Sequence, residues 1–151
     1  MIVNNSVELI GNTPVVKLSN LHEDGMADIY IKLEGKNPGG SIKDRAALGM
    51  LEEAEKTGIL VKGGTIIEPT SGNTGIALTF IGVLKGYRVI VVMPDTMSIE
   101  RRNIVKSYGG ELVLTDGSLG MKGAIEKAEE LSNTIAGSFI PQQFTLSLIH
   151  I

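Results

Sequence analysis

The sequence predicts an α/β domain, with a parallel sheet flanked by helices. From about residue 28 onward, short apolar runs of strand length alternate with stretches in which apolar residues recur at helical spacing. Glycine is unusually frequent, at 19 of 151 residues, and many of the glycines separate these runs. An alternation of strand, helix and strand is typical of a parallel sheet with helices on its faces.

Six segments have the pattern of strands. Residues 28–34 alternate between apolar and polar side chains, as a half-buried strand does. Residues 87–93 form an apolar run that is typical of a central parallel strand. Residues 10–18 fit this scheme less well, and we expect there a turn followed by a strand of another sheet. The remaining strands are expected at residues 65–68, 111–115 and 138–141.

Four helices are expected between these strands. Residues 74–84 are apolar nearly all round, which predicts a buried helix that ends at Gly86. Ser98 has the position of a cap for a helix that runs to Tyr108 and stops at Gly109. The other two helices are expected around residues 47–54, with a stop at Gly58, and around residues 121–128.

The composition argues against several classes of protein. The formal charge is −3 and aromatic residues make up only 4%, so nucleic-acid binding has little support. Cysteine is absent and only two histidines occur, which favours neither a zinc site nor a Ser–His–Asp triad. No apolar run approaches membrane-spanning length, and residues 1–7 are too short and polar for a signal peptide. We therefore expect a cytoplasmic protein without a metal site or a membrane anchor.

Glycine and polar residues gather in the segments that directly follow four of the predicted strands. In a parallel sheet these segments all emerge at the carboxyl ends of the strands, where open α/β sheets bind ligands. Loops of this kind also need glycines and caps for structural reasons alone, and that explanation is favoured for the third and fourth segments. The four segments are residues 37–41, 70–75, 94–98 and 116–120.

The first of these segments leads to a lysine in a special position. Ser41 and Asp44 have the spacing of a capping box, which places Lys43 in the first turn of a helix. An ammonium group beside the positive end of the helix dipole is disfavoured, so this amine should lose its proton readily. Such an amine is what imine chemistry with an aldehyde cofactor requires. From local spacing alone, however, a surface lysine neutralised by Asp44 is the favoured interpretation.

The second segment, residues 70–75, has the composition of an anion-binding loop. It offers hydroxyl groups, an amide and backbone N–H groups at the start of a helix, where a carboxylate or a phosphate binds well. It does not match the Walker pattern, and neither G-x-G-x-x-G nor G-x-S-x-G occurs in the chain. A nicotinamide-binding Rossmann domain is therefore disfavoured.

Four longer motifs resemble one family of enzymes. Residues 32–45, KLEGKNPGGSIKDR, are similar to the cofactor-lysine segment of the fold-type II pyridoxal-phosphate enzymes, and residues 68–78, EPTSGNTGIAL, resemble their substrate-carboxylate loop. Cysteine synthases and cystathionine β-synthases share both segments. Residues 93–102, MPDTMSIERR, and 120–130, GMKGAIEKAEE, favour the cysteine synthase (O-acetylserine sulfhydrylase) type. The similarity covers about residues 5–144.

The resemblance implies roles for individual residues. Lys43 would form an imine with pyridoxal 5′-phosphate and later remove the α-proton of the substrate. Asn73 would hydrogen-bond the phenolic oxygen of the cofactor. The implied reaction is β-replacement, in which O-acetylserine loses acetate and sulfide takes its place to give L-cysteine. The residues implied to bind the amino-acid substrate are Thr70, Ser71, Gly72, Asn73, Thr74 and Gln143.

The resemblance also implies a division of the chain within a tryptophan synthase β-like fold. Residues 1–36 correspond to the start of a large domain, and residues 37–144 to a small mobile α/β domain that closes over the substrate. Residues 145–151 depart from the family pattern, and we interpret them as a non-family tail. Relatives carry their cofactor-phosphate loop and the serine facing the pyridine nitrogen later in the chain. We therefore expect an N-terminal fragment that is inactive by itself although its small domain folds.

Other functions remain open. A cystathionine β-synthase would use homocysteine in place of sulfide, and a serine or threonine dehydratase fits the motifs after residue 93 less well. A non-catalytic anion-binding module that keeps only the small domain is the alternative from another class. The resemblance implies a homodimer and, in some relatives, a serine acetyltransferase tail bound in the active site.

Overall fold

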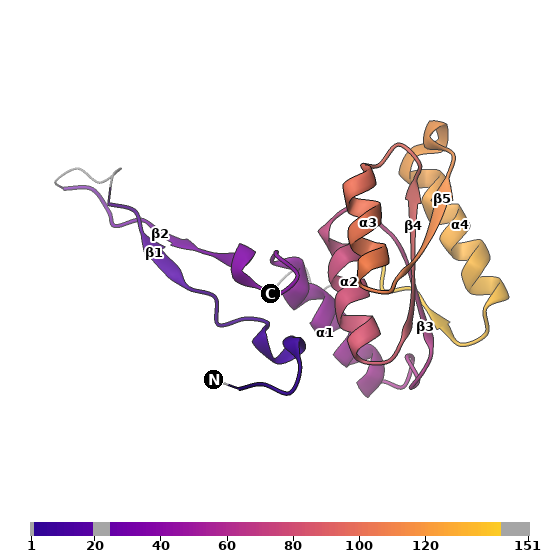
Figure 1. The fold of residues 1–151 in the computed structure, drawn as a ribbon, viewed down its shortest axis with the longest axis horizontal. Coiled ribbons are helices and arrows are strands. Elements are labelled where there is room, and N and C mark those ends of the chain that lie inside the picture. Colours follow the sequence, from indigo (N-terminus) through magenta and orange to yellow (C-terminus); the bar gives the residue numbers. More distant parts are fainter. Residues whose placement is uncertain (1, 20–24, 143–151) are drawn as a thin grey trace.

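The structure, a computed structural model, describes residues 2–19 and 25–142. It consists of an arm, residues 2–36, and an α/β body, residues 43–142, joined by a short loop. Figure 1 shows the arm as a long, thin extension that projects away from the layered body.

The body is built on a parallel sheet. Its strands are β3 (Thr65–Pro69), β4 (Arg88–Pro94), β5 (Glu111–Thr115) and β6 (Ser138–Phe139). They lie in the order β5-β4-β3-β6, and each neighbouring pair is parallel. The prediction of a parallel α/β sheet is confirmed for all the strands from residue 65 onward.

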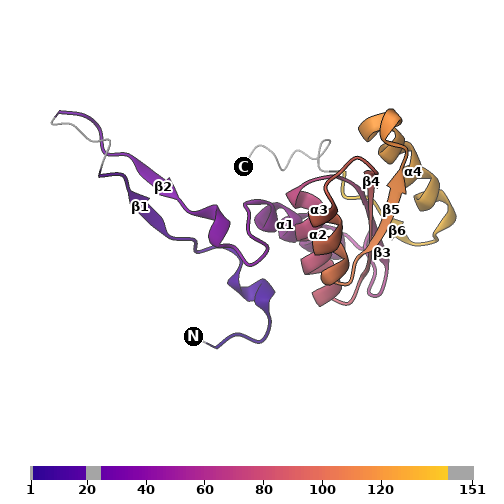
Figure 2. The same cartoon turned by 45° about the horizontal axis from the view of Figure 1, so that its top comes forward.

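Helices cover both faces of this sheet. They are α1 (Lys43–Lys56), α2 (Asn73–Leu84), α3 (Ile99–Ser107) and α4 (Gly120–Thr134). Helices α1, α2 and α3 lie on one side of the sheet, and α4 lies on the other side (Figures 1 and 2). Ser98 caps α3 as predicted, because its hydroxyl accepts a hydrogen bond from the backbone N–H of Arg101 at 3.5 Å.

Alternate side chains of β3 and β4 enter two separate cores. Because both faces of the sheet are covered, the strands read as apolar runs rather than as a strict alternation. The core on the side of α1 and α2 contains Ile66, Val89, Val91 and Met93, and the core beneath α4 contains Ile67, Ile90, Val92, Ala124 and Ala128.

Helix α2 is buried nearly all round, as its sequence predicts. Every residue from Thr74 to Gly82 is buried. A side chain would not fit at Gly82, where a Cβ atom would lie 2.6 Å from Val89 Cγ2, so the helix approaches the sheet closely. The helix has only 12 residues. Among the described residues, no helix is long and apolar enough to cross a membrane.

The arm contains an antiparallel pair of strands that is separate from the main sheet. Strand β1 (Val15–Lys17) pairs with β2 (Tyr30–Lys32), and the expectation of another sheet for residues 10–18 is confirmed. The expectation that residues 28–34 begin the parallel sheet is wrong. Their alternation does indicate a strand, but Tyr30 and Ile31 are 59% and 42% exposed, and the partner is the preceding strand of a local hairpin.

Short 3₁₀ turns complete the described elements. They are η1 (Ser6–Leu9), η2 (Glu34–Lys36) and η3 (Gly117–Leu119). Turn η2, at the end of the arm, lies between β2 and α1, so the segment after β2 leads to the start of a helix of the body and does not emerge from a strand of the main sheet.

Candidate active site

The order of the strands indicates where on the sheet a ligand is expected to bind. The chain adds β4 and then β5 on one side of β3, and it later returns to add β6 on the other side. The direction of growth therefore reverses at β3, and open α/β sheets bind ligands at such a reversal, beyond the carboxyl ends of the strands. Thr70 directly follows β3 and lies at this point.

The loop from β3 to α2 is held firmly against the sheet. Thr70 is 4% exposed, and its backbone N–H donates to the carbonyl of Val92 at 3.0 Å. Its hydroxyl accepts from the N–H of Gly72 at 3.4 Å. Gly75 has no room for a side chain, because a Cβ atom there would lie 2.8 Å from Thr70 Cγ2 and 3.2 Å from Val91 Cγ1. Helix α2 therefore begins in close contact with the end of β3.

The same loop presents hydrogen-bond donors at the start of a helix. Helix α2 begins at Asn73, and the backbone N–H groups of Ser71 and Asn73 donate to no oxygen of the described residues. Ser71 is half-buried and Asn73 is exposed, whereas Thr74 is buried. Unpaired N–H groups at the positive end of a helix dipole favour an anion. This loop can therefore bind a small anion such as a carboxylate.

Lys43 is the first residue of α1, and its side chain is exposed. Helix α1 packs against α2 and ends near the beginning of β3, whereas α2 starts after the end of β3. Both helices therefore run against the direction of the strands and begin toward the carboxyl edge of the sheet (Figure 1). The fold brings Lys43 and the donor loop to the same edge of the body.

The predicted capping box at Ser41 and Asp44 is wrong in its pairing. The Ser41 hydroxyl accepts from the N–H of Lys43 at 3.1 Å, and Ile42 occupies the cap position without a side-chain bond. The Asp44 carboxylate accepts instead from the N–H of Gly39 at 2.6 Å. This approach is possible because Gly39 has no side chain, since a Cβ atom there would lie 2.5 Å from Asp44 Oδ1. Lys43 still occupies the first helical turn, as predicted.

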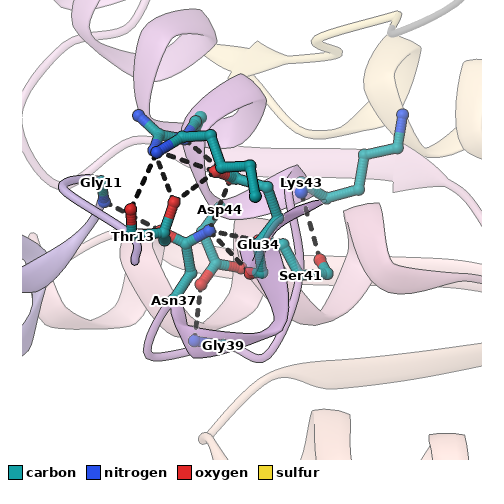
Figure 3. Close-up of polar contacts among 10 residues, drawn as sticks. Gly11, Thr13, Glu34, Asn37, Gly39, Ser41, Lys43 and Asp44 are labelled. Atoms are coloured by element: carbon teal, nitrogen blue, oxygen red, sulfur yellow. Dashed lines mark hydrogen bonds and ion pairs between the residues drawn. The ribbon is translucent and has the colours of Figure 1, made fainter. Parts of the chain in front are cut away.

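Asp44 does not neutralise the neighbouring lysine. It is 0% exposed, and burial raises the pKa of its carboxyl group against the opposing effect of the Gly39 N–H. Among the described residues, its Oδ1 atom has no hydrogen-bond partner, and its Oδ2 atom faces Gly39. The carboxyl group therefore braces the turn before α1, and the Lys43 amine extends away from it (Figure 3).

A cluster of four polar side chains, which we call the Glu34 cluster, ties the arm to α1 (Figure 3). Arg45 donates through Nε and Nη2 to the two carboxylate oxygens of Glu34, at 2.8 and 3.0 Å. The Thr13 hydroxyl donates to Glu34 Oε1 at 2.6 Å. The hydrogen bonds from Arg45 and Thr13 lower the pKa of Glu34 to about 2. The fourth member is Asn37.

Asn37 connects this cluster to the loop before Lys43. It is 3% exposed, and its side-chain NH₂ group lies 2.9 Å from Glu34 Oε2 and 3.1 Å from the carbonyl of Ser41, donating to both. Its side-chain oxygen accepts from the N–H of Gly11 at 2.8 Å. One buried amide therefore joins Gly11 of the arm, Glu34 of turn η2 and Ser41 in the loop before α1.

The depressed pKa of Glu34 predicts a loss of stability in acid. Since the folded protein holds this pKa at about 2, below the ordinary 4.5, the ionised carboxylate stabilises the fold above pH 4.5. We expect the stability difference between the natural protein and a Glu34→Gln variant to shrink as the pH falls from 4.5 to 2. Urea titrations at several pH values measure this difference in unfolding free energy. Added salt should reduce the difference because Arg45 is partly exposed. A pH-independent difference would contradict this assignment.

Gln143 lies outside the described residues. The backbone N–H of Gln142, directly before it, donates to the buried carboxylate of Glu68 at 3.1 Å. The structural role of the Glu34 cluster was not predicted, and Asp44 was predicted to pair with Ser41 and not with Gly39, although all of these residues but Thr13 lie in the motif at residues 32–45. Only the three-dimensional contact with Thr13 reveals the cluster.

Comparison with known proteins identifies the family. The chain matches the family of pyridoxal-phosphate dependent enzymes over residues 7–150, and it therefore belongs to that family. Its parallel sheet with flanking helices is that of the fold-type II members, and enzymes of this kind depend on pyridoxal phosphate.

Particular relatives are enzymes of sulfur amino-acid chemistry. A cysteine synthase of Staphylococcus aureus (strain Mu50) is 59% identical over 94% of this chain and 46% of its own length. A solved hydrogen sulfide-producing enzyme of Fusobacterium nucleatum is 56% identical, with a TM-score of 0.86, over 95% of this chain and 48% of that one. A solved cystathionine β-synthase of Bacillus anthracis is 43% identical, with a TM-score of 0.81, over 95% and 54%. The chain spans about half the length of the curated relatives it matches.

The residues of this chain suit the aldehyde end of pyridoxal phosphate and the carboxylate of an amino-acid substrate. This cofactor reacts through its aldehyde with a lysine amine, and its substrates carry an α-carboxylate. Lys43 offers an exposed amine at the start of α1, and the loop at residues 70–75 offers unpaired donors for a carboxylate. An amine at Lys43 and the donors of this loop therefore have the chemistry that such a cofactor and such a substrate require.

Proposed function

We propose that the complete protein makes L-cysteine from O-acetylserine and sulfide by a pyridoxal-phosphate-dependent β-replacement. The observation that carries this proposal is the placement of Lys43 and of the donor loop at one edge of the sheet, at the starts of two packed helices. The 59% identity to a cysteine synthase supports the same reaction.

In this proposal Lys43 acts as the base. Its amine would hold the cofactor and, once the amino group of the substrate has displaced it, would take the proton from the α-carbon of the bound amino acid. When bound, pyridoxal phosphate supplies the electron sink that makes this carbon acidic. Acetate would leave the adjacent β-carbon, hydrosulfide would add to that carbon as the thiol, and Lys43 would return the proton to the α-carbon to give L-cysteine.

The donor loop orients the substrate. The α-carboxylate would be bound by residues 70–74 and by Gln143 from the segment after β6. Asn73 would have a second task, a hydrogen bond to the phenolic oxygen of the cofactor. A carboxylate fixed at the start of α2 directs the α C–H bond toward Lys43, and such fixed orientation makes a large contribution to the rate. The firm contact of Thr70 with the sheet keeps the loop in place for this role.

Cystathionine synthesis is the second candidate. The 43% identity to a solved cystathionine β-synthase favours it, and it differs in using homocysteine in place of sulfide. The higher identity to the cysteine synthase favours sulfide.

The proposal also covers the domains, the oligomeric state, the location and the partner of the enzyme. Residues 37–144 act as a small domain that closes over the substrate, and residues 1–36 belong to a larger domain. The active protein is a cytoplasmic homodimer, and a serine acetyltransferase is a possible partner of its active site.

The decisive experiment is an assay of the full-length protein. With added pyridoxal phosphate, O-acetylserine and sulfide, we expect L-cysteine to form, and the rate should fall when homocysteine replaces sulfide. The 151-residue chain by itself should form none. Faster turnover of homocysteine would favour the second candidate. Carboxylate binding with no product and no cofactor-dependent absorbance would instead indicate a non-catalytic anion-binding module.

A further inference from the structure

The position of the Lys43 amine depends on how the first turn of α1 is held. The middle of the helix is fixed by Ala47, Leu51 and Ala54, which are packed in the core. Lys43 and its neighbour Ile42 are exposed, and they follow a loop with glycines at positions 39 and 40. Apart from the hydrogen bond between Asp44 and the N–H of Gly39, core packing therefore does not hold the end of α1 that carries the amine.

The Glu34 cluster supplies that support from the arm. Arg45 lies two residues after Lys43, and its guanidinium forms a bidentate pair with Glu34, which lies before the loop. Arg45 Nη2 also donates to the Thr13 hydroxyl at 3.3 Å. The pair thus joins the two ends of the segment that contains Lys43. A guanidinium fork fixes direction as well as distance, which a lysine ammonium does not.

Two further contacts make the arrangement specific. Asn37, inside the same segment, holds the carbonyl of Ser41, and the Ser41 hydroxyl accepts from the N–H of Lys43. A Cβ atom at Gly11 would lie 3.0 Å from Arg45 Nη1, so the arm lies directly against the guanidinium. The contacts therefore continue from the arm through Arg45 and Asn37 to the backbone of Lys43.

We propose that the Arg45–Glu34 pair positions the Lys43 amine for proton transfer, so that Arg45 and Glu34 are positioning residues of the active site. This inference rests on the proposed function, because it assigns a task to Lys43. Neither residue contacts the substrate, and both act through the first turn of α1. Since reaction rates are sensitive to displacements of about 1 Å, loosening this turn should lower kcat more than substrate binding.

The body contains a matched control for this pair. Arg88 donates through Nε and Nη2 to the two oxygens of Glu111, both at 2.7 Å. These residues begin β4 and β5, at the amino edge of the sheet, opposite the candidate site. The pair has the same bidentate geometry, although its side chains are more exposed, at 48% and 53% against 39% and 18% for Arg45 and Glu34.

The test compares Arg45→Lys with Arg88→Lys in the full-length protein. Both variants keep the positive charge but lose the bidentate hydrogen bonds of the guanidinium group. For Arg45→Lys we expect kcat to fall by about tenfold or more, while KM for O-acetylserine stays within about twofold. Borohydride reduction followed by peptide mass spectrometry should show slower attachment of the cofactor to Lys43. Hydrogen exchange without cofactor should be faster in residues 39–45. Arg88→Lys should change none of these quantities.

The outcomes separate the two proposals. If the natural protein attaches cofactor at Lys43 but Arg45→Lys behaves like Arg88→Lys, the positioning role is wrong and the proposed function stands. A rise in KM with unchanged kcat also overturns the positioning role. If the natural protein attaches no cofactor at Lys43, the proposed function fails and the positioning role fails with it.

Discussion

Replacing Lys43 with alanine in the full-length protein should abolish both the covalent attachment of pyridoxal phosphate and the formation of cysteine. In the proposed reaction this amine holds the cofactor and also moves the α-proton. Removal of a general base alone costs about 10²–10⁴-fold in rate, and the loss of attachment adds to this cost. Rate measurements with O-acetylserine and sulfide, together with the visible absorbance of the bound cofactor, test the prediction.

Two further variants control for this result. Lys36→Ala removes another exposed lysine from the same part of the chain and should leave the rate unchanged. Lys43→Arg keeps the positive charge but cannot supply a neutral amine, so it should be as inactive as the alanine variant. Substantial activity in either Lys43 variant would show that another residue performs these tasks.

Replacing Gly75 with alanine should damage the donor loop. The new Cβ atom would lie 2.8 Å from Thr70 Cγ2, so either the Thr70 side chain must rotate or the start of α2 must move. Overpacking of this kind costs about 1–3 kcal/mol, and the better helix propensity of alanine returns about 1 kcal/mol of it. Because the displaced groups belong to the proposed carboxylate site, KM for O-acetylserine should rise by about tenfold. Urea unfolding and steady-state kinetics measure the two effects.

The same helix provides a control for this substitution. Gly82 is also buried in α2, and its added Cβ atom would lie 2.6 Å from Val89 Cγ2, far from the start of the helix. Gly82→Ala should therefore lower the stability to a similar or greater extent and leave KM unchanged. If both variants raise KM equally, the effect of Gly75→Ala comes from general loss of stability and not from the loop.

The helices and strands of the body could be predicted because the pattern of apolar residues in each one follows directly from which of its faces are buried. The run at β4 is apolar because both faces of the sheet are covered, and the all-round apolar pattern of α2 arises from its position between α1 and the sheet. The assignment of residues 28–34 to the same sheet failed for a physical reason. A period of two residues indicates a strand, but it does not indicate which strand is its neighbour.

Only part of the candidate site could be predicted from the sequence, for a similar reason. Lys43 and the loop at residues 70–75 lie in short local motifs, so their places at the starts of two helices could be predicted. The role of Arg45 depends on Glu34 and on Thr13, which lies 32 residues away in sequence. No local pattern reports such a contact. Asp44 likewise bonds Gly39 and not Ser41, a choice that depends on the shape of the loop.

The strand order also has a consequence for synthesis on the ribosome. From β3 to β5 each new strand pairs with the one made just before it, so these units can assemble as they emerge. Strand β6 must instead return past β5 and β4 to reach β3. A nascent chain that has reached only β5 already contains Lys43 and the donor loop, but one side of β3 is still open. Until the last strand arrives, Glu68 cannot form its bond to Gln142, and this edge is open to pairing with another chain.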